Sequence, residues 1–185
     1  MALKESNMLP LGTEAPDFAL LDTVTGKEVS LESIQSEKAT VIMFTCNHCP
    51  YVLHINEELV KLSTEYMAKG VSFVAISSND VVNYPQDSPE KMKELAAEVG
   101  YPFPYLYDAT QVVAKAYDAA CTPDFYVFDG DLKLSYRGRL CASRPNTNVP
   151  VTGEDLRAAI DAILEDKPVT EKQYPSAGCN IKWLK

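Results

Sequence analysis

The sequence has no long hydrophobic run. None of its apolar segments approaches the ~20 residues that a helix needs to cross a bilayer, so we expect no membrane-spanning segment and no membrane partner. Residues 1–11 carry Lys4 and Glu5 and lack a continuous apolar block followed by a small-residue cleavage site, which argues against a secretory signal peptide. The expected location is the cytoplasm, where thiols are kept reduced.

Positive charge is also scarce. Lysine and arginine number 17 against 26 aspartates and glutamates, so the net charge is −9 at pH 7. A nucleic-acid partner needs clustered basic side chains that neutralise phosphates, and the basic residues here are scattered along the chain. We therefore expect no nucleic-acid binding.

Histidine is nearly absent and cysteine is sparse. Two histidines, without a second Cys-x-x-Cys, give little support to a closed four-ligand zinc site. The five cysteines are an odd number, which does not suit the framework of a disulfide-rich secreted protein. In a reducing compartment, a close pair of cysteines is catalytic or metal-binding. The five are Cys46, Cys49, Cys121, Cys141 and Cys179.

What the chain does have is an alternation of apolar runs and helical stripes. With 46% hydrophobic and 23% charged residues, it suits one globular domain over residues 1–185. The order predicts an α/β fold: a mixed central sheet flanked by helices, with an N-terminal hairpin and a tail, residues 166–185, that packs on the domain. The predicted strands cover residues 18–21, 27–30, 40–44, 71–76, 125–128 and 131–136. The predicted helices open at Pro50, at Ser88-Pro89, at a capping pair of Asp108 and Gln111, and at Thr152.

The candidate chemistry lies in Cys46-Asn47-His48-Cys49, between the predicted strand at residues 40–44 and the helix that follows. Unpaired N–H groups and the helix dipole favour an anion at this point, and the thiolate is the reactive form of cysteine. We predict that Cys46, at the more exposed edge, is the attacking thiol and that Cys49, one turn deeper, resolves. A Cys46–Cys49 disulfide can then close and reopen without moving the fold.

His48 is the third candidate catalytic residue. It lies between the two cysteines, where a positive or donor group stabilises a thiolate. Because a stabilised thiolate makes the reduced state easier to form, we predict a couple that is more oxidising than one with Gly-Pro between the cysteines.

The order of the motifs resembles the redoxin branch of the thioredoxin superfamily, and within it a peroxiredoxin-like (AhpC/TSA-type) subgroup with a Cys-x-x-Cys-Pro motif. The resemblance implies a thioredoxin-like fold and a thiol–disulfide oxidoreductase with a redox or antioxidant role, whose partners are protein or small-molecule disulfides and thiols. It covers residues 9–185. The motifs that carry it are Gly12 to Phe18, the dithiol followed by Pro50, Phe103 to Asp108, Thr122-Pro123, and Gly178 to Trp183.

The same resemblance implies two substrate-binding residues. Pro123 corresponds to the cis proline of the thioredoxin fold. Thr122 then lies beside the dithiol, where its backbone groups bind a disulfide partner. No cofactor is implied.

An alternative is a peroxide reductase that uses Cys49 as its peroxidatic cysteine. By the resemblance, Cys46 stands where such enzymes have a threonine, and Pro123 stands where they have an arginine. Two groups that orient a peroxide and stabilise its developing charge are therefore missing. The buried acid of thioredoxins is missing too, since no Asp or Glu lies between Lys38 and Asn56, so proton transfer rests on His48, on water or on a distant group.

A second alternative is a soft-metal module in which Cys46, Cys49 and His48, or Cys121, hold zinc or copper(I). Cys121 is otherwise a small core residue, and Cys141 has no local partner. If the tail folds back over the site, Cys179 is a resolving thiol. Alternatively, Ile181 and Trp183 hold the tail on the surface of the domain and Cys179 has only a packing role. Whether the protein is a monomer or a dimer stays open.

Overall fold

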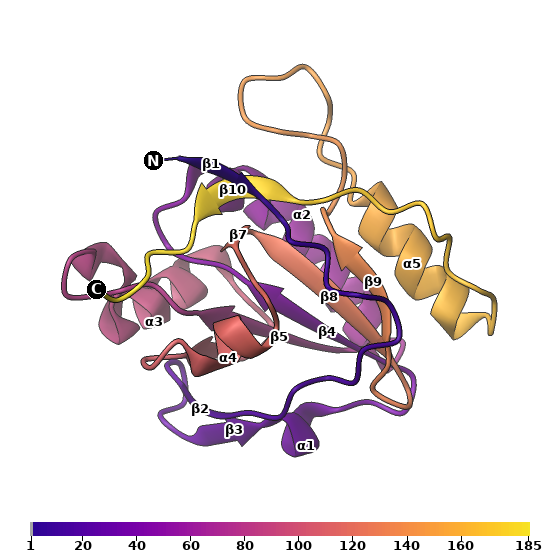
Figure 1. The fold of residues 1–185 in the computed structure, drawn as a ribbon, viewed down its shortest axis with the longest axis horizontal. Coiled ribbons are helices and arrows are strands. Elements are labelled where there is room, and N and C mark those ends of the chain that lie inside the picture. The colour runs from indigo at the N-terminus through magenta and orange to yellow at the C-terminus, as the bar shows by residue number, and fades with distance from the viewer. Residues whose placement is uncertain (1) are drawn as a thin grey trace.

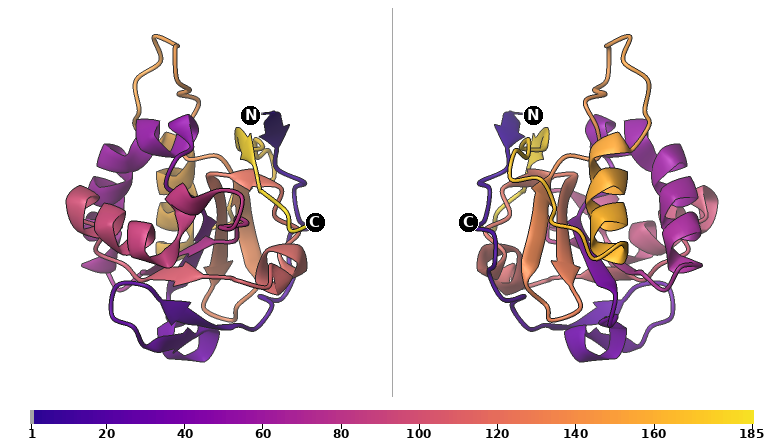
Figure 2. Two further views of the ribbon diagram at one scale, coloured as in Figure 1. Left: turned by 90° about the vertical axis from the view of Figure 1, so that its left-hand side faces the viewer. Right: turned by 90° about the vertical axis from the view of Figure 1, so that its right-hand side faces the viewer.

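The computed structural model describes residues 2–185 and has a mixed central sheet covered by helices on both faces (Figures 1 and 2). Within this sheet β5 lies between β4 and β6 and is parallel to both, whereas the other pairs are antiparallel. The predicted mixed α/β fold and the N-terminal hairpin are therefore confirmed. The strand order is β3 (Glu28–Ser30), β2 (Ala19–Asp22), β6 (Tyr105–Tyr107), β5 (Ser72–Ser77), β4 (Ala39–Phe44), β8 (Asp124–Asp129) and β9 (Leu134–Gly138).

Strand β4 lies at the centre of the core because both of its faces are buried. Val41 and Met43 pack into a cluster with helices α2 (Pro50–Met67), α3 (Pro89–Val99) and α5 (Glu154–Leu164). Ile42 and Phe44 pack into a second cluster on the opposite face, with the short helices α1 (Leu31–Ile34) and α4 (Val112–Ala116). A continuous apolar run is what a strand covered on both faces requires.

A second, smaller sheet was not predicted. The tail forms β10 (Ala177–Asn180), which lies antiparallel between β1 (Leu3–Glu5) and β7 (Cys121–Thr122). Figure 1 shows β1 and β10 side by side, away from the main sheet. These strands are two to four residues long, so their pairing depends on neighbours far along the chain, which local sequence patterns do not report.

The helix starts agree with the sequence at two positions and differ at two. Helix α2 starts at Pro50, and Ser88 caps α3 by accepting the Lys91 N–H, as predicted. The residue before α5 is Gly153, one position after the predicted start at Thr152, whose hydroxyl accepts the Glu154 N–H at 3.4 Å. Asp108 accepts the Ala114 N–H without Gln111, whose side-chain amide donates instead to the Ser78 and Lys182 carbonyls. The predicted capping pair is therefore wrong, because long-range hydrogen bonds recruit the glutamine.

None of the helices formed by residues 2–185 is both long and apolar enough to cross a bilayer.

Candidate functional site

The dithiol turn, Cys46–Cys49, connects the end of β4 to the start of α2. Cys49 is the residue that precedes the helix, and Pro50 is its first helical residue. A proline fits there because the first helical N–H has no partner within the helix. The side chains of Cys46 and Cys49 are only 1% and 0% exposed. The prediction that Cys46 lies at an exposed edge is therefore wrong: two other segments of the chain cover both sulfurs.

The first of these segments is a polar loop that ends in the 3-10 helix η1 (Pro85–Asp87). The carboxylate of Asp87 is fully buried and accepts the Asn47 N–H at 2.8 Å and the Asn79 side-chain amide at 2.8 Å. Asn47 in turn donates to the Gln86 carbonyl at 2.9 Å. These hydrogen bonds tie the dithiol turn to the loop at its Cys46 end.

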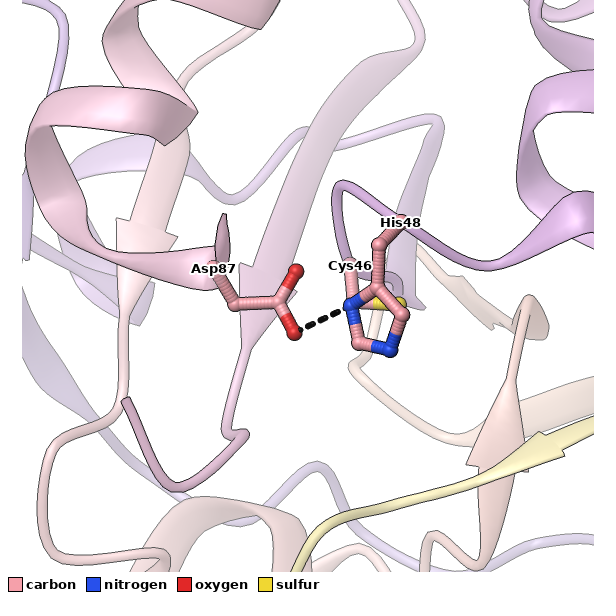
Figure 3. A group of neighbouring side chains, drawn as sticks. All are labelled: Cys46, His48 and Asp87. Atoms are coloured by element: carbon pink, nitrogen blue, oxygen red, sulfur yellow. Dashed lines mark ion pairs between the residues drawn. The ribbon is translucent and has the colours of Figure 1, made fainter. Parts of the chain in front are cut away.

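His48 points toward the same carboxylate (Figure 3). Its Nδ1 lies 2.7 Å from Oδ2 of Asp87, although the two atoms are not aligned as a directed N–H···O bond. The ring also stacks on Tyr84, with centroids 6.0 Å apart and planes 5° from parallel. The predicted contact partner of His48 was a thiolate; its closest charged partner is instead Asp87.

Cys46, His48 and Asp87 form a group whose ligand atoms all lie within 4.8 Å of one another. Thiolate, imidazole and carboxylate suit zinc. Both oxygens of Asp87 already accept hydrogen bonds, however, and a closed site needs a fourth ligand. The predicted metal set differs from this group, because Cys49 faces the tail and the Cys121 sulfur faces the Ser176 carbonyl at 4.0 Å.

Thr122 and Pro123 adjoin the dithiol from the opposite side. The peptide bond between them is cis, as the resemblance implied. The Thr122 hydroxyl lies 3.5 Å from the Cys46 sulfur, and the Thr122 carbonyl lies 3.4 Å from the Cys49 sulfur. One residue thus contacts both cysteines.

The second covering segment is the tail. Strand β10 pairs with β7 so that Cys179 lies opposite Thr122. The main chain of Thr122, expected to bind a disulfide partner, is therefore paired with the protein's own tail. Cys179 brings its sulfur to 2.6 Å from that of Cys49. Cys46, Cys49 and Cys179 pack together with Val52 in one small buried cluster.

The electrostatic surroundings of the two dithiol cysteines differ. The pKa of Cys49 is lowered to about 5, chiefly by the neighbouring Cys46 thiol and, despite burial, also by the Cys179 thiol. The backbone N–H of Val52, in the first turn of α2, contributes to the same lowering of this pKa.

The pKa of Cys46 moves in the opposite direction. It is raised above its ordinary value, first by the interaction with Cys49 and next by burial, with the Asp87 carboxylate adding to the rise. The prediction that Cys46 carries the low pKa is wrong for this arrangement, because the interaction between the two thiols favours the thiolate at Cys49. The covering segments add a negative charge near Cys46 and hydrogen-bond donors near Cys49.

Sequence reasoning missed Asp87 as a residue of the site. It lies 40 residues beyond Asn47, in the segment between β5 and α3, for which no role was predicted from the sequence. A signal was available: β4 and β5 are adjacent parallel strands, so the segments that follow them leave the sheet at the same edge. An acid in the loop after β5 is therefore placed near residues that follow β4.

The remaining candidates lie away from the dithiol. Cys141 is buried in the core cluster around α2 and α5. The pKa of Cys121 is raised by burial, which makes it an inert thiol. Arg137 donates to the Leu9 carbonyl, and Arg139 pairs with Asp155 at 2.7 Å.

A narrow groove runs beside the cis proline. Tyr51, Ile55, Pro123 and Arg144 are among the residues that line it. Tyr51 and Ile55 place it against the first two turns of α2.

Comparison with known proteins identifies the family. The model of the AhpC/TSA family matches residues 11–137. Among curated protein sequences, none matches this chain.

Solved structures show the same fold. The chain is 65% identical to an uncharacterised conserved protein from Geobacillus kaustophilus, with a TM-score of 0.98 over 100% of this chain and 97% of that one. It is 45% identical to a hypothetical protein from Sinorhizobium meliloti 1021, with a TM-score of 0.95 over 97% and 98% of the two chains. The thioredoxin domain of a thiol–disulfide oxidoreductase from Bacteroides vulgatus is 18% identical, with a TM-score of 0.62 over 80% and 96%, which supports the thioredoxin-like fold.

Proposed function

Because this chain belongs to the AhpC/TSA family, we propose that it is a thiol–disulfide oxidoreductase that cycles a disulfide between Cys46 and Cys49. The observation that carries the proposal is the shared contact of both sulfurs with Thr122, at the start of a helix. Its substrates are protein or small-molecule disulfides, and its role is thioredoxin-like redox or antioxidant chemistry. Thr122 and Pro123 are the proposed substrate-binding residues.

The lowered pKa of Cys49, about 5, supports a revised division of roles. The Cys49 thiolate attacks a substrate disulfide, forms a mixed disulfide and expels one substrate thiolate. Cys46 then attacks the Cys49 sulfur, expels the second substrate thiolate and leaves a Cys46–Cys49 disulfide. Two electrons pass from the protein to the substrate. Since both sulfurs are buried, a partner reaches them only when one covering segment moves.

His48, within the dithiol turn, and Asp87, at the end of η1, supply a proton acceptor for Cys46. Cys46 must lose its proton to attack, and its pKa is raised, chiefly by Cys49. The His48 ring can take that proton, and the buried Asp87 carboxylate, 2.7 Å away, stabilises the resulting imidazolium. Proton transfer thus rests on His48, with Asp87 as its stabilising partner.

Insulin reduction with purified single variants tests the proposal. Cys49→Ser should lose turnover by on the order of 10³-fold or more, because the attacking thiolate is gone, and Cys46→Ser should turn over more slowly than the wild type, because the resolving thiol of the Cys46–Cys49 cycle is gone. Cys141→Ser, a change in the core away from the dithiol, is the matched control and should keep turnover. Retention of wild-type turnover in both dithiol variants would exclude the proposed cycle.

A redox titration against glutathione adds a second measurement. Because the Cys49 thiolate is stabilised, the couple should be less negative than the about −270 mV of thioredoxin. A strongly reducing value would contradict the stabilised thiolate.

Peroxide reduction is the second candidate, favoured by the same lowered pKa at Cys49. The arginines at positions 137 and 139 are bound to other groups, which argues for slow turnover. A peroxide consumption assay that fails with Cys49→Ser but persists with Cys46→Ser would favour this function. Metal analysis of the purified protein tests the soft-metal module.

Three further points belong to the proposal. We expect residues 1–185 to act as one domain, because the tail strand pairs with both β1 and β7. The cytoplasm is the expected location, where the five free thiols would be kept reduced. We expect no nucleic-acid partner, because the net charge is −9.

A further inference from the structure

The tail strand lies unusually close to the cis-proline segment. Cys179 is paired with Thr122, and Asn180 is paired with Cys121. A Cβ at Gly178 would overlap the Thr122 carbonyl oxygen and would lie 2.8 Å from its carbonyl carbon. Only glycine permits this approach, which brings the next residue, Cys179, against the dithiol.

Cys179 is held from both sides, so its position does not depend on a loose chain end. On one side, the Ser176 N–H donates to the Ser6 hydroxyl at 2.8 Å, and the Ser176 hydroxyl donates to the Pro123 carbonyl. On the other side, the Lys182 N–H donates to the Asn79 side chain at 2.8 Å. Between these points the two sulfurs, of Cys179 and Cys49, are 2.6 Å apart.

This arrangement places three sulfurs in one buried cluster with Cys49 as the shared member. Cys46 and Cys179 approach it from different sides, Cys46 from the turn before α2 and Cys179 from β10. Cys49 can therefore form a disulfide with either neighbour, one at a time.

We propose that Cys179 is a third redox-active thiol, which takes over the disulfide from the Cys46–Cys49 pair by attacking the sulfur of Cys49. The inference rests on the proposed function, because that cycle generates the starting disulfide. In the exchange, the Cys49–Cys179 bond forms and the Cys46–Cys49 bond breaks. Cys46 leaves as the thiol, with the proton that Cys179 gives up. One disulfide replaces another, so no outside oxidant or reductant is needed.

The consequence is a second oxidised state, in which α2 is covalently joined to the tail strand. In that state Cys46 is a free thiol again, beside His48 and Asp87. A merely packed Cys179 would produce no such state, since the oxidised protein would contain only the Cys46–Cys49 bond.

Peptide mapping of the oxidised full-length protein distinguishes the two disulfides. Trypsin cleaves after Lys38, Lys61, Lys172 and Lys182, so Cys46 and Cys49 share peptide 39–61 while Cys179 lies in peptide 173–182. After oxidation with oxidised glutathione, we expect the wild type to yield both peptide 39–61 with an internal disulfide and the cross-linked pair of the two peptides. This measurement needs no variant and so does not depend on how a variant folds.

Single variants identify the sulfur that is joined to Cys179. Cys46→Ser should retain the cross-linked pair, Cys49→Ser should lose it, and the control Cys141→Ser should give the wild-type pattern. Alkylation of Cys46 in the oxidised protein should be lost in Cys179→Ser, because Cys46 is then held in its bond to Cys49.

The outcomes separate this inference from the proposed function. A wild type and a Cys46→Ser variant that both lack the cross-linked pair would overturn the role of Cys179, while an internal disulfide in peptide 39–61 would leave the proposed function standing. If Cys179→Ser formed no internal disulfide in that peptide, the proposed function and the exchange that starts from it would both be overturned.

Discussion

Two segments cover the dithiol turn, and they differ in chemistry. The loop cover, residues 79–87, faces Cys46 with a buried carboxylate and hydrogen-bonding amides. The tail cover, residues 176–182, faces Cys49 with a third sulfur and a strand of main chain. The first brings negative charge, and the second brings hydrogen-bond donors and a redox partner.

The difference teaches that the covers add to the contrast between the two sulfurs, whose pKa values are set first by their interaction with each other. A helix dipole acts on any anion in its first turn and so favours both cysteines. Asp87 adds to the rise of the pKa of Cys46, whereas the Cys179 thiol and backbone help to lower that of Cys49. Each cover can be altered on its own, which makes the comparison testable.

Removing the tail cover should have the largest effect. In Gly178→Ala the new methyl group overlaps the Thr122 carbonyl oxygen, so β10 must leave β7. We expect a loss of about 3 kcal/mol or more in the free energy of unfolding. Alkylation should accelerate more at Cys49 than at Cys46, since the loop cover stays in place. Chemical denaturation measures the first effect, and the separate labelling rates of Cys46 and Cys49 within peptide 39–61 measure the second.

Gly12→Ala is the matched control for that substitution. Its φ of +82° strains an alanine, but no atom lies within 4 Å of the added methyl group. It should cost about 1 kcal/mol and leave the labelling rates unchanged. Equal behaviour of the two variants would show that the tail does not shield the dithiol.

Asp124→Asn tests a polar contact of the tail cover, in which the Ser6 hydroxyl donates to Asp124 and accepts the N–H of Ser176 in the tail. Burial raises the pKa of this carboxyl from 3.8 to about 7, although the Ser6 hydroxyl donates to it at 2.8 Å. Since the folded pKa lies above the unfolded one, the neutral acid stabilises the fold below about pH 4, and this contribution is lost as the pH rises toward 7. The asparagine should remove this decline and raise stability at pH 8 by on the order of 2 kcal/mol.

Denaturation midpoints between pH 4 and 8 measure the effect of Asp124→Asn. Asp131→Asn, on the exposed turn after β8, is the control and should keep the wild-type decline. A pH profile of Asp124→Asn that matches the wild type would mean that Asp124 ionises in the folded protein as freely as in the unfolded one.

The dithiol turn itself could be predicted from the sequence because its signals are local. An apolar run gives β4, a proline marks the start of α2, and apolar residues at steps of three and four give the buried face of that helix. The cis proline came from the family resemblance and was confirmed. The predicted α/β class came from the order of strands and helices, and the thioredoxin-like fold came from the family resemblance.

The covers could not be predicted, because they depend on contacts between distant segments. Cys179 lies 130 residues from Cys49, and β10 has only four residues, too few for a periodic pattern. The role of Cys179 therefore stayed open between resolving and packing. The exposure of Cys46 was predicted wrongly for the same reason, because the covers bury it. Its pKa was predicted wrongly because the interaction with Cys49, burial and Asp87 together raise it, which the spacing of the dithiol does not report.

Neutralising the loop cover should have a smaller effect on stability than the previous changes. Asp87→Asn keeps the acceptor for the Asn47 N–H but turns an amide toward the donor of Asn79, at a cost of about 1 kcal/mol. Because the carboxylate adds to the rise of the pKa of Cys46, its loss should lower that pKa and accelerate Cys46 alkylation at pH 7.

The rate is best measured in a Cys49→Ser background, where Cys46 is the only thiol of the dithiol. Asp80→Asn is the control, since Asp80 lies in the same loop and accepts the Val82 N–H at 3.0 Å instead of facing the dithiol. Equal Cys46 rates in the two variants would mean that the charge of Asp87 does not reach the sulfur.

The smallest effect is expected at the C-terminal end of the tail cover. A substitution there tests which contacts hold the tail cover in place. Ile181 is buried at 1% exposure in the cluster beneath α4, whereas Trp183 is 39% exposed, with Lys115 5.8 Å from its ring. Trp183→Ala should therefore cost less than about 1 kcal/mol and leave the Cys49 labelling rate unchanged, with Trp183→Phe restoring the loss. If the labelling rate rose in Trp183→Ala, the indole and not the strand pairing would hold Cys179 against the dithiol. Both ends of the tail would then position Cys179. The contrast between the charged loop cover and the hydrogen-bonded tail cover would no longer account for its part of the difference in pKa between Cys46 and Cys49.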